Sequence, residues 1–297
     1  MEKKINLQMF AEENITATAD MNPEISIDFV SRITQNILEL QKLLGIAEME
    51  PMASGTAIKV YKMTQVNTPE QVAEGETIKL TKIKRELVKT IELTLKKFRR
   101  NTTAEAIQKV GRVMAINQAD EKLVKGIQKG IKQDFYDVLL TGTGEASGTT
   151  LQQTLAAAWG KLQKFHEDED VDPLYFVSSD DVADYLGTSQ VTMQTAFGMS
   201  YIEDFLGLGT VIVSPRLTKG KVVGVAKENM HGAYIPANSG DVANTFGLTS
   251  DETGLVGMKH STDDTNATVN TLAMSGVVFY PEMLDGVFIG TISPAGA

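Results

Sequence analysis

Two pairs of adjacent carboxylates are the residues of this chain whose type and spacing could do acid–base chemistry. They are Asp180-Asp181 and Asp263-Asp264, and paired carboxylates are what general acid–base catalysis uses. Each pair lies in a polar stretch typical of a helix start or a loop, where Asp more often caps a helix or faces solvent. The chain has no Gly-x-Ser-x-Gly motif and no Ser, His and Asp arrangement that would supply a nucleophile. The residues therefore predict no enzyme, and a hydrolase using Asp180 or Asp181 stays open as an alternative of a different class.

Metal and phosphate sites are not predicted either. The histidines at 166, 231 and 260 lie far apart and the chain has no cysteine, whereas zinc sites use closely spaced His or Cys pairs. The acidic run at 167–170 lacks the glycine and the ligand register of a calcium loop. The glycine-rich run at 142–150 lacks the Gly-Lys-Ser/Thr ending of a phosphate loop. We interpret it as a loop and a domain boundary, and we expect no cofactor.

The composition is that of an ordinary globular protein without a membrane segment. Of the 297 residues, 42% are hydrophobic and 22% are charged. No stretch approaches the roughly 18 apolar residues that a membrane helix needs. The first residues are too polar for a secretory signal, and the absence of cysteine fits a reducing cytoplasm.

The most informative elements are two extended segments and the helix start that follows them. Residues 55–63 form the first, and residues 86–95 the second, in which apolar and polar side chains alternate with the period of a half-buried strand. Thr102 and Glu105 then fit a capping box at the start of a helix. An isolated two-stranded hairpin is marginal in water, so we expect this one to rest on another surface, which could belong to a second copy of the chain.

The spacing of apolar residues predicts the remaining elements. Helical spacing runs from Asn22-Pro23 to Gly45, and again over two segments that start near Thr103 and Asp120. From residue 151 the pattern changes to helices alternating with short strands, which indicates a mixed α+β fold. The expected elements of this second half are a helix over 151–165, a helix start at 178–180, and strands over 174–177, 211–213, 222–225, 232–235, 255–260, 269–278 and 287–292.

The net charge of −10 is unevenly distributed. Residues 79–100 contain nine Lys or Arg and two Glu, a local +7, while the rest of the chain has 19 basic and 36 acidic residues, a net −17. Lysines that protect a strand edge from aggregation are one interpretation, and a nucleic-acid arm is the least favoured, because an acidic body repels phosphate. We favour contact with acidic surfaces of identical subunits. The basic residues predicted to make it are Lys79, Lys82, Lys84, Arg85, Lys96, Lys97, Arg99 and Arg100.

Four stretches give the chain a resemblance to the major capsid proteins of tailed phages with the Hong Kong 97-type fold. The resemblance extends from about residue 20 to the end, and it is nearest to capsid proteins of phages that infect Gram-positive bacteria. The stretches are residues 72–107, including Lys97-Phe98-Arg99-Arg100-Asn101-Thr102-Thr103; residues 181–187; residues 194–213; and Ser275-Gly276-Val277-Val278-Phe279-Tyr280-Pro281-Glu282 with residues 284–287.

The resemblance implies an α+β Hong Kong 97-type fold and a division of the chain. An N-terminal arm and helix would comprise residues 1–50. The extended E-loop hairpin would comprise residues 51–101 and lie over a neighbouring subunit. The P-domain with its spine helix would take 102–150, the A-domain 151–253, and strands returning to the P-domain 254–297. Contacts around the capsomer axes would involve the A-domain loop with Gly198, Gly207 and Gly209.

The implied function is a structural subunit of the virion. Pentamers and hexamers would form an icosahedral shell in the host bacterial cytoplasm and enclose double-stranded DNA without sequence-specific binding. A portal and a separate scaffolding protein are expected partners, because no long scaffolding-like segment precedes the fold. No lysine, asparagine and glutamate triplet for cross-linking can be placed, so we expect a shell without covalent links. An encapsulin-like compartment shell is the alternative with the same fold.

The first residues suggest a cleavage site. Ile5-Asn6-Leu7-Gln8-Met9-Phe10-Ala11 resembles a short N-terminal extension of some phage structural proteins and of a ribosomal protein of Firmicutes, which a host cysteine protease trims after Phe-Ala. The resemblance implies cleavage between Ala11 and Glu12.

Overall fold

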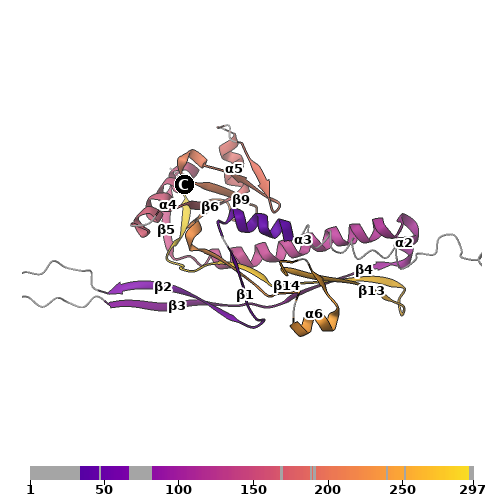
Figure 1. The fold of residues 1–297 in the computed structure, drawn as a ribbon. Coiled ribbons are helices and arrows are strands. Elements are labelled where there is room, and N and C mark those ends of the chain that lie inside the picture. Colours follow the sequence, from indigo (N-terminus) through magenta and orange to yellow (C-terminus); the bar gives the residue numbers. More distant parts are fainter. Residues whose placement is uncertain are drawn as a thin grey trace, which may run out of the picture.

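A long helix, α3, is the element around which the chain is organised. The computed structural model describes residues 34–46, 48–66, 82–167, 170–187, 189, 192–238, 240–250 and 252–293. Helix α3 spans Arg112–Leu139, and the short helix α2, Ala104–Val110, precedes it. Gly111 separates them with φ of 83°, a left-handed backbone that interrupts the helix. Figure 1 shows α3 crossing the molecule between one group of strands and another.

Two helices are present after Thr103, as expected, but the break between them lies at Gly111 rather than near Asp120, so the second helix, α3, has 28 residues. Leu123, Ile127, Ile131 and Phe135 are all buried along one face of it, as the helical spacing predicted. Asp120, which we expected at a helix start, lies inside α3 and is only 2% exposed. The prediction failed because an Asp followed by Glu is typical of a first helical turn, whereas this Asp has buried partners elsewhere in the chain.

A mixed sheet of seven strands lies on one side of α3. Its order is β5-β16-β10-β6-β9-β8-β7. Helix α4, Leu151–Phe165, and helix α5, Ser179–Leu186, pack on one face, where Leu155, Tyr175 and Val222 are buried together. The opposite face packs against α3. The strands are β5 (Gly144–Gly148), β6 (Pro173–Ser178), β7 (Gln194–Ala196), β8 (Met199–Ile202), β9 (Thr210–Ser214), β10 (Lys221–Ala226) and β16 (Val287–Ile292), with a short 3-10 helix η1 (Phe205–Gly207) between β8 and β9.

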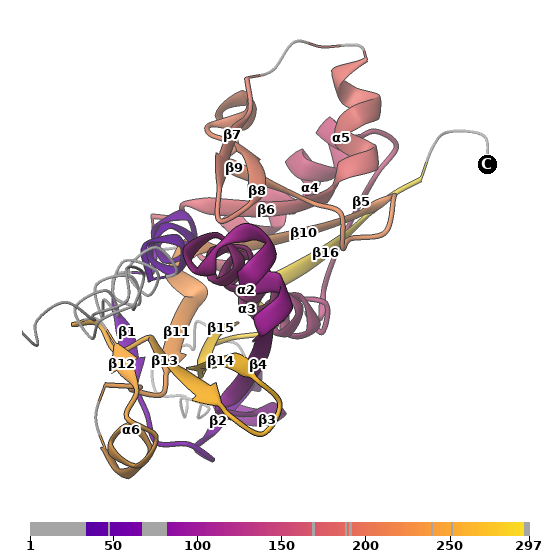
Figure 2. The ribbon, with the colours of Figure 1, turned by 90° about the vertical axis from the view of Figure 1, so that its right-hand side faces the viewer.

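Two smaller sheets lie on the other side of α3, as the view in Figure 1 and the turned view in Figure 2 both show. One has the order β12-β13-β14-β4, and the other β1-β11-β15. Residues 34–43 are helical, and Ile37 and Leu40 pack into the same core as α3. The remaining elements are β1 (Met49–Pro51), β4 (Lys96–Thr103), the 3-10 helix η2 (Lys227–Asn229), β11 (Met230–Tyr234), α6 (Gly240–Phe246), β12 (Thr249–Ser250), β13 (Val256–Asp263), β14 (Thr268–Ser275) and β15 (Val277–Pro281).

The expected hairpin is present and forms a sheet of its own. Strand β2, Ala57–Val66, pairs antiparallel with β3, Lys82–Glu92, and this pair is a separate two-stranded sheet. Figure 1 shows it extending away from the body of the subunit. The prediction that it lacks partner strands is therefore confirmed for the residues that the structure describes.

The glycine-rich run at 142–150 is a strand rather than the expected loop. Strand β5 pairs in parallel with β16, with Gly144 opposite Phe288. A Cβ atom on Gly144 would lie 2.4 Å from Cδ1 of Phe288, so the close approach requires glycine. Composition alone suggested a loop because glycine is the commonest residue of turns.

Sheet membership also differs from the division expected along the chain. Strand β4 carries the basic residues 96–100 and pairs with β14, so it is not part of the hairpin. Strand β16 pairs with β10 in the seven-stranded sheet, whereas β13, β14 and β15 lie in the smaller sheets.

The helix start after β4 lies one residue later than predicted. Thr103 is the N-cap of α2, and its Oγ1 accepts a hydrogen bond from the backbone N–H of Ala106 at 3.3 Å. Thr102 is instead buried in β4, opposite Val269. The capping box of Thr102 with Glu105 was therefore wrong.

Candidate intersubunit interface

The base of the hairpin is held on the body of its own subunit at Tyr61. The N–H of Tyr61 donates to the carbonyl oxygen of Glu282, and the N–H of Leu284 donates to that of Tyr61, each at 3.3 Å. Ile58 and Val60 are buried in a small core with Leu284. Beyond Tyr61 the described residues of the hairpin form two paired strands, and none of them belongs to a buried hydrophobic cluster.

Arg85 reinforces this anchor. Its guanidinium carbon lies 3.9 Å from the centroid of the Tyr61 ring, a cation–π geometry. Its Nη2 also lies 3.9 Å from Oε1 of Glu282, a contact between half-exposed groups that is worth little by itself. Arg85, predicted to contact a neighbour, thus already has two partners in its own subunit.

Two further lysines connect the hairpin and β4 to α3. Lys89 Nζ donates to the carbonyl oxygen of Asp137 at 3.0 Å. Lys96 forms an ion pair with Asp134, and both groups are only about one third exposed. These contacts fix where the hairpin leaves the body, so Lys96 acts within the subunit in addition to any contact outside it.

The basic residues of β4 point to two faces of its sheet. Lys96 and Phe98 lie toward α3, near Gly130. On the other face, Arg99 Nη2 donates to Oδ1 of Asn270 at 3.2 Å and lies 3.9 Å from Asp263. Lys97 and Arg100 are exposed and form no ion pair within the described part of the subunit. The single basic cluster that the sequence suggested is thus divided between two elements.

Lys82 and Lys84 are the basic residues of the hairpin that are available to a partner. Both are exposed on β3, and neither forms an ion pair with another described residue. Lys79 lies outside the described residues, as do Ala11 and Glu12 of the predicted cleavage site. None of these placements tests the predicted contacts, which stay predictions.

The predicted axial contact residues lie in two turns: Gly198 is between β7 and β8, and Gly207 and Gly209 are between β8 and β9, where the backbone is unusual. Gly209 has φ of +130°, and a Cβ atom there would lie 2.3 Å from the carbonyl oxygen of Pro173, so only glycine fits. Leu206 has φ of 55° although it is not glycine, and its side chain is 60% exposed. Such conformations cost about 1–3 kcal/mol each and persist only where the surrounding structure enforces them. The turn therefore presents Leu206 to solvent in a fixed position.

The carboxylate pairs have structural roles. Oδ2 of Asp181 accepts a hydrogen bond from the N–H of Gly220 at 2.8 Å, and burial raises the pKa of this carboxyl. Ser178 caps α5 as predicted, because its Oγ accepts from the N–H of Asp180 at 3.3 Å. Asp263 turns the β13–β14 connection by accepting hydrogen bonds from Thr265, which lower the pKa of Asp263.

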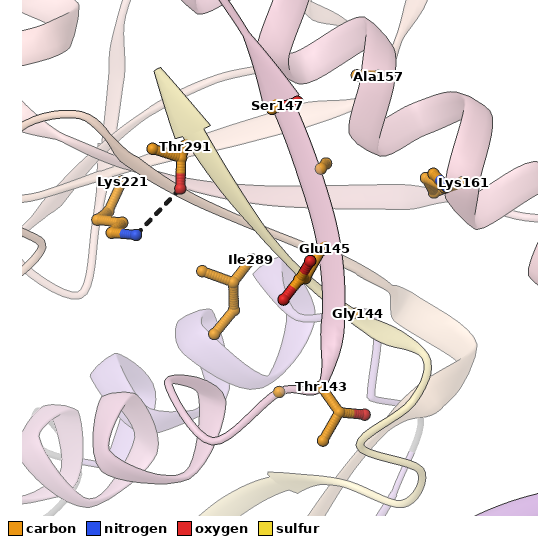
Figure 3. A pocket seen from close by; sticks show the side chains of 11 residues that line it. Thr143, Gly144, Glu145, Ser147, Ala157, Lys161, Lys221, Ile289 and Thr291 are labelled. Carbon is orange, nitrogen blue, oxygen red and sulfur yellow. Dashed lines mark hydrogen bonds between the residues drawn. The ribbon is translucent and has the colours of Figure 1, made fainter. Parts of the chain in front are cut away.

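A hollow of about 920 Å³ lies beside β5. Figure 3 shows Glu145 and Ile289 facing it, with Lys221 hydrogen-bonded to Thr291 at 3.0 Å on one side and Lys161 on α4 beyond β5. Its charged lining residues are one glutamate and two lysines, without a histidine or a pair of carboxylates. The chemistry of a phosphate loop or of an acid–base pair is thus not assembled here.

One buried polar cluster was not predicted from the sequence. Oδ1 of Asp120 accepts a hydrogen bond from Oγ1 of Thr271 on β14 at 3.1 Å. Nε2 of His260 on β13 lies 3.3 Å from Oδ2 of Asp120, an ionic contact when the imidazole is protonated, although its geometry is not that of a hydrogen bond. The cluster joins α3 to two strands that lie about 140 and 150 residues further along the chain, which is why the local pattern could not reveal it.

Comparison with known proteins decides the family. A sequence profile described as "Phage capsid protein" matches residues 89–281, well over half of the chain. The chain belongs to the phage capsid protein family. No curated protein sequence matches it.

Solved structures support the fold. The capsid of cyanophage A-1(L) is similar with a TM-score of 0.52 and 11% identity, over 86% of this chain and 92% of that one. A virus-like particle from Pyrococcus furiosus is similar with a TM-score of 0.50 and 11% identity, over 88% of this chain and 97% of that one. The capsid of an empty GTA particle is similar with a TM-score of 0.50 and 12% identity, over 84% of this chain and 89% of that one. At these identities the likeness concerns the fold alone, and it confirms the predicted Hong Kong 97-type fold.

The family fixes the type of function. The chain is a structural major capsid protein of an icosahedral phage shell, located in the virion, and it is not an enzyme. The alternative of a hydrolase was therefore wrong, and the family match favours a phage shell over an encapsulin-like compartment. Among the described residues, no helix is long and apolar enough to span a membrane.

Proposed function

We propose that the β2–β3 hairpin is the assembly arm of this capsid subunit and lies over a neighbouring copy in each pentamer and hexamer. The observation that carries the proposal is the isolation of the hairpin: beyond Tyr61 it is a two-stranded sheet, and residues 84–88 of β3 are exposed. A two-stranded sheet in water is marginal. A neighbouring subunit would cover it and supply the missing contacts.

The charge of the hairpin supports the same role. The described residues of β2 and β3 include six Lys or Arg and two Glu, within a chain whose net charge is −10. Lys82 and Lys84 are free to meet an acidic surface, and Lys97 and Arg100 present further positive charge on β4. Complementary charge of this kind favours the correct partner and register more than it adds affinity.

The proposed shell encloses double-stranded DNA without sequence-specific contacts. The acidic balance of the chain outside the basic stretch suits a wall that does not bind packed phosphate. The A-domain loop with Gly198, Gly207 and Gly209 is proposed to meet its copies around the capsomer axes. A host among Gram-positive bacteria, a portal, a separate scaffolding protein, trimming between Ala11 and Glu12, and the absence of covalent cross-links belong to this proposal through the resemblance of the sequence.

Charge reversal on the hairpin tests the proposal. We expect the double substitution Lys82→Glu with Lys84→Glu to leave the subunit folded, because neither side chain has a described partner in it, and to prevent shell formation. Circular dichroism checks the fold, and negative-stain microscopy with sedimentation checks assembly.

The matched control reverses two exposed lysines on α4, Lys161→Glu with Lys164→Glu, which changes the net charge equally. The control is expected to assemble. Normal shells from the hairpin variant, or equal loss of shells from both variants, would contradict a specific role for the hairpin.

A further inference from the structure

An apolar groove lies where the base of the hairpin, β4 and α6 meet. It has a volume of about 570 Å³. Met52 and Leu95 line it from the two ends of the hairpin base, and Val242 and Leu248 line it from α6 and the turn after it. Figure 1 shows α6 on the face of the β13–β14 sheet opposite α3.

The exposed face of α6 extends this groove. Val242 is 45% exposed and Phe246 is 43% exposed. They are four residues apart and therefore lie on one side of the helix. Large apolar side chains that are exposed next to an apolar groove are typical of a site that binds another protein surface.

The hairpin has an exposed apolar pair that matches the groove in character. Leu87 is 52% exposed and Val88 is 44% exposed. Lys89 is opposite Val60 and Leu87 is opposite Tyr61, so Val88 is the extra residue of a β-bulge. A bulge bends a strand and redirects its side chains. In Figure 1 the hairpin extends away from α6 of its own subunit. Because both side chains are exposed, they are available to a surface of another copy.

Charges beside the two apolar surfaces are complementary. Asp241 at the start of α6 lines the groove, and residues 229–258 contain three acidic residues and no Lys or Arg. Lys84 and Arg85 precede Leu87 on the hairpin. Lys97 also lines the groove and is exposed, and on the hairpin Glu86 lies next to Leu87.

We infer that Leu87 and Val88 of one subunit dock in the Met52–Leu95–Val242 groove of a second copy, with Lys84 toward Asp241 and Glu86 toward Lys97. The inference rests on the proposed role of the hairpin and names the surface that receives it. The contact is heterologous, because the hairpin of one copy meets α6 of the next, and such contacts build rings when the rotation closes.

Cysteine cross-linking tests the docking, since the parent chain has no cysteine and every disulfide must come from the introduced residues. Subunits with Leu87→Cys are mixed with tagged subunits carrying Val242→Cys, assembled together and oxidised mildly. We expect a mixed dimer as the main covalent product in a non-reducing gel. In a matched control the tagged subunits carry Leu140→Cys instead of Val242→Cys. Leu140 lies at the end of α3 and is 44% exposed, and this mixture is expected to give little mixed dimer.

The result separates the docking from the assembly role. Shells with no mixed dimer, or with dimers of Leu87→Cys subunits alone, overturn the docking and leave the role of the hairpin intact. If the cysteine variants form no shells, Val242→Glu with Phe246→Glu decides the matter in the otherwise unchanged chain. Loss of assembly with a folded subunit supports the groove, provided that Leu140→Glu still assembles, and normal shells from the α6 variant refute it.

Discussion

The buried contact between Asp120 and Thr271 gives a prediction about how α3 is fixed on its sheet. Both side chains are almost completely buried, at 2% and 1% exposure, and they share a hydrogen bond of 3.1 Å. Replacing Asp120 by Ala leaves the buried hydroxyl of Thr271 without this acceptor, which costs about 1–3 kcal/mol. We therefore expect Asp120→Ala to lower the free energy of unfolding by about 1–3 kcal/mol.

The control for this substitution lies on the same helix. Asp137 is exposed, and its Oδ1 accepts from Gln133 at 2.7 Å. Ala has a higher helix propensity than Asp by a few tenths of a kcal/mol, and this gain applies to both positions. Asp137→Ala is therefore expected to change stability by no more than about 0.5 kcal/mol.

The assay is urea unfolding of the unassembled subunit, followed by circular dichroism and by the fluorescence of Trp159. Thr271→Val and the double variant Asp120→Ala with Thr271→Val complete a double-mutant cycle. The double variant is expected to lose less free energy of unfolding than the two single variants lose together, because removing both partners leaves neither one buried without a hydrogen bond. We expect a coupling energy of about 1–2 kcal/mol. Additive losses within about 0.5 kcal/mol, or an Asp120→Ala variant as stable as Asp137→Ala, would refute the anchoring of α3 by this contact.

Three further predictions concern the core and the turn between β8 and β9. Gly209→Ala should cost about 3 kcal/mol or more because its Cβ meets the oxygen of Pro173, whereas Gly207→Ala, at φ of +74° with open space around it, should cost about 1–2 kcal/mol; urea unfolding that ranks them equally would contradict this. Phe176→Ala should cost about 3–5 kcal/mol, because Phe176 is completely buried in the main core, and normal yields of stable subunit would count against it. Burial raises the pKa of Tyr136 to about 12 from 10.0, so between these pH values the unfolded state binds fewer protons and stability falls as pH rises; Tyr136→Phe should make that alkaline decline less steep, and an unchanged pH profile would contradict it.

Elements with a local signal were predicted well from the sequence. Helix 151–165 was placed at its observed bounds, because Thr150 caps it and its apolar residues recur at helical spacing. The buried strands β6, β9 and β10 were found from short apolar runs between turn residues. These signals lie within a few residues of each other, so one sequence contains them.

Features that depend on distant partners were missed. Strand β5 looked like a loop because the reason for its first glycine is a distant partner: Gly144 fits against Phe288, which lies about 140 residues away. The basic residues of β4 looked like part of the hairpin because the partner strand β14 follows about 170 residues later. Local charge and composition do not reveal such pairing, so one basic stretch of the sequence lies on two elements of the fold, β3 and β4.

The contrast between the body and the hairpin has a consequence for assembly. The main core joins α3 to the seven-stranded sheet and to β13, β14 and β15 within one subunit, so the body can fold before it meets a neighbour. In the part of the hairpin beyond Tyr61 that the structure describes, no residue belongs to such a core. Ordering a residue costs about 1–2 kcal/mol of backbone entropy, and burying a Leu or Val side chain returns about 1.5–3 kcal/mol. Two docked side chains thus do little more than offset the ordering of the few residues around them, and each contact is weak and reversible. A shell that closes correctly needs contacts of this kind, because a misplaced subunit must be able to leave before many such contacts act together.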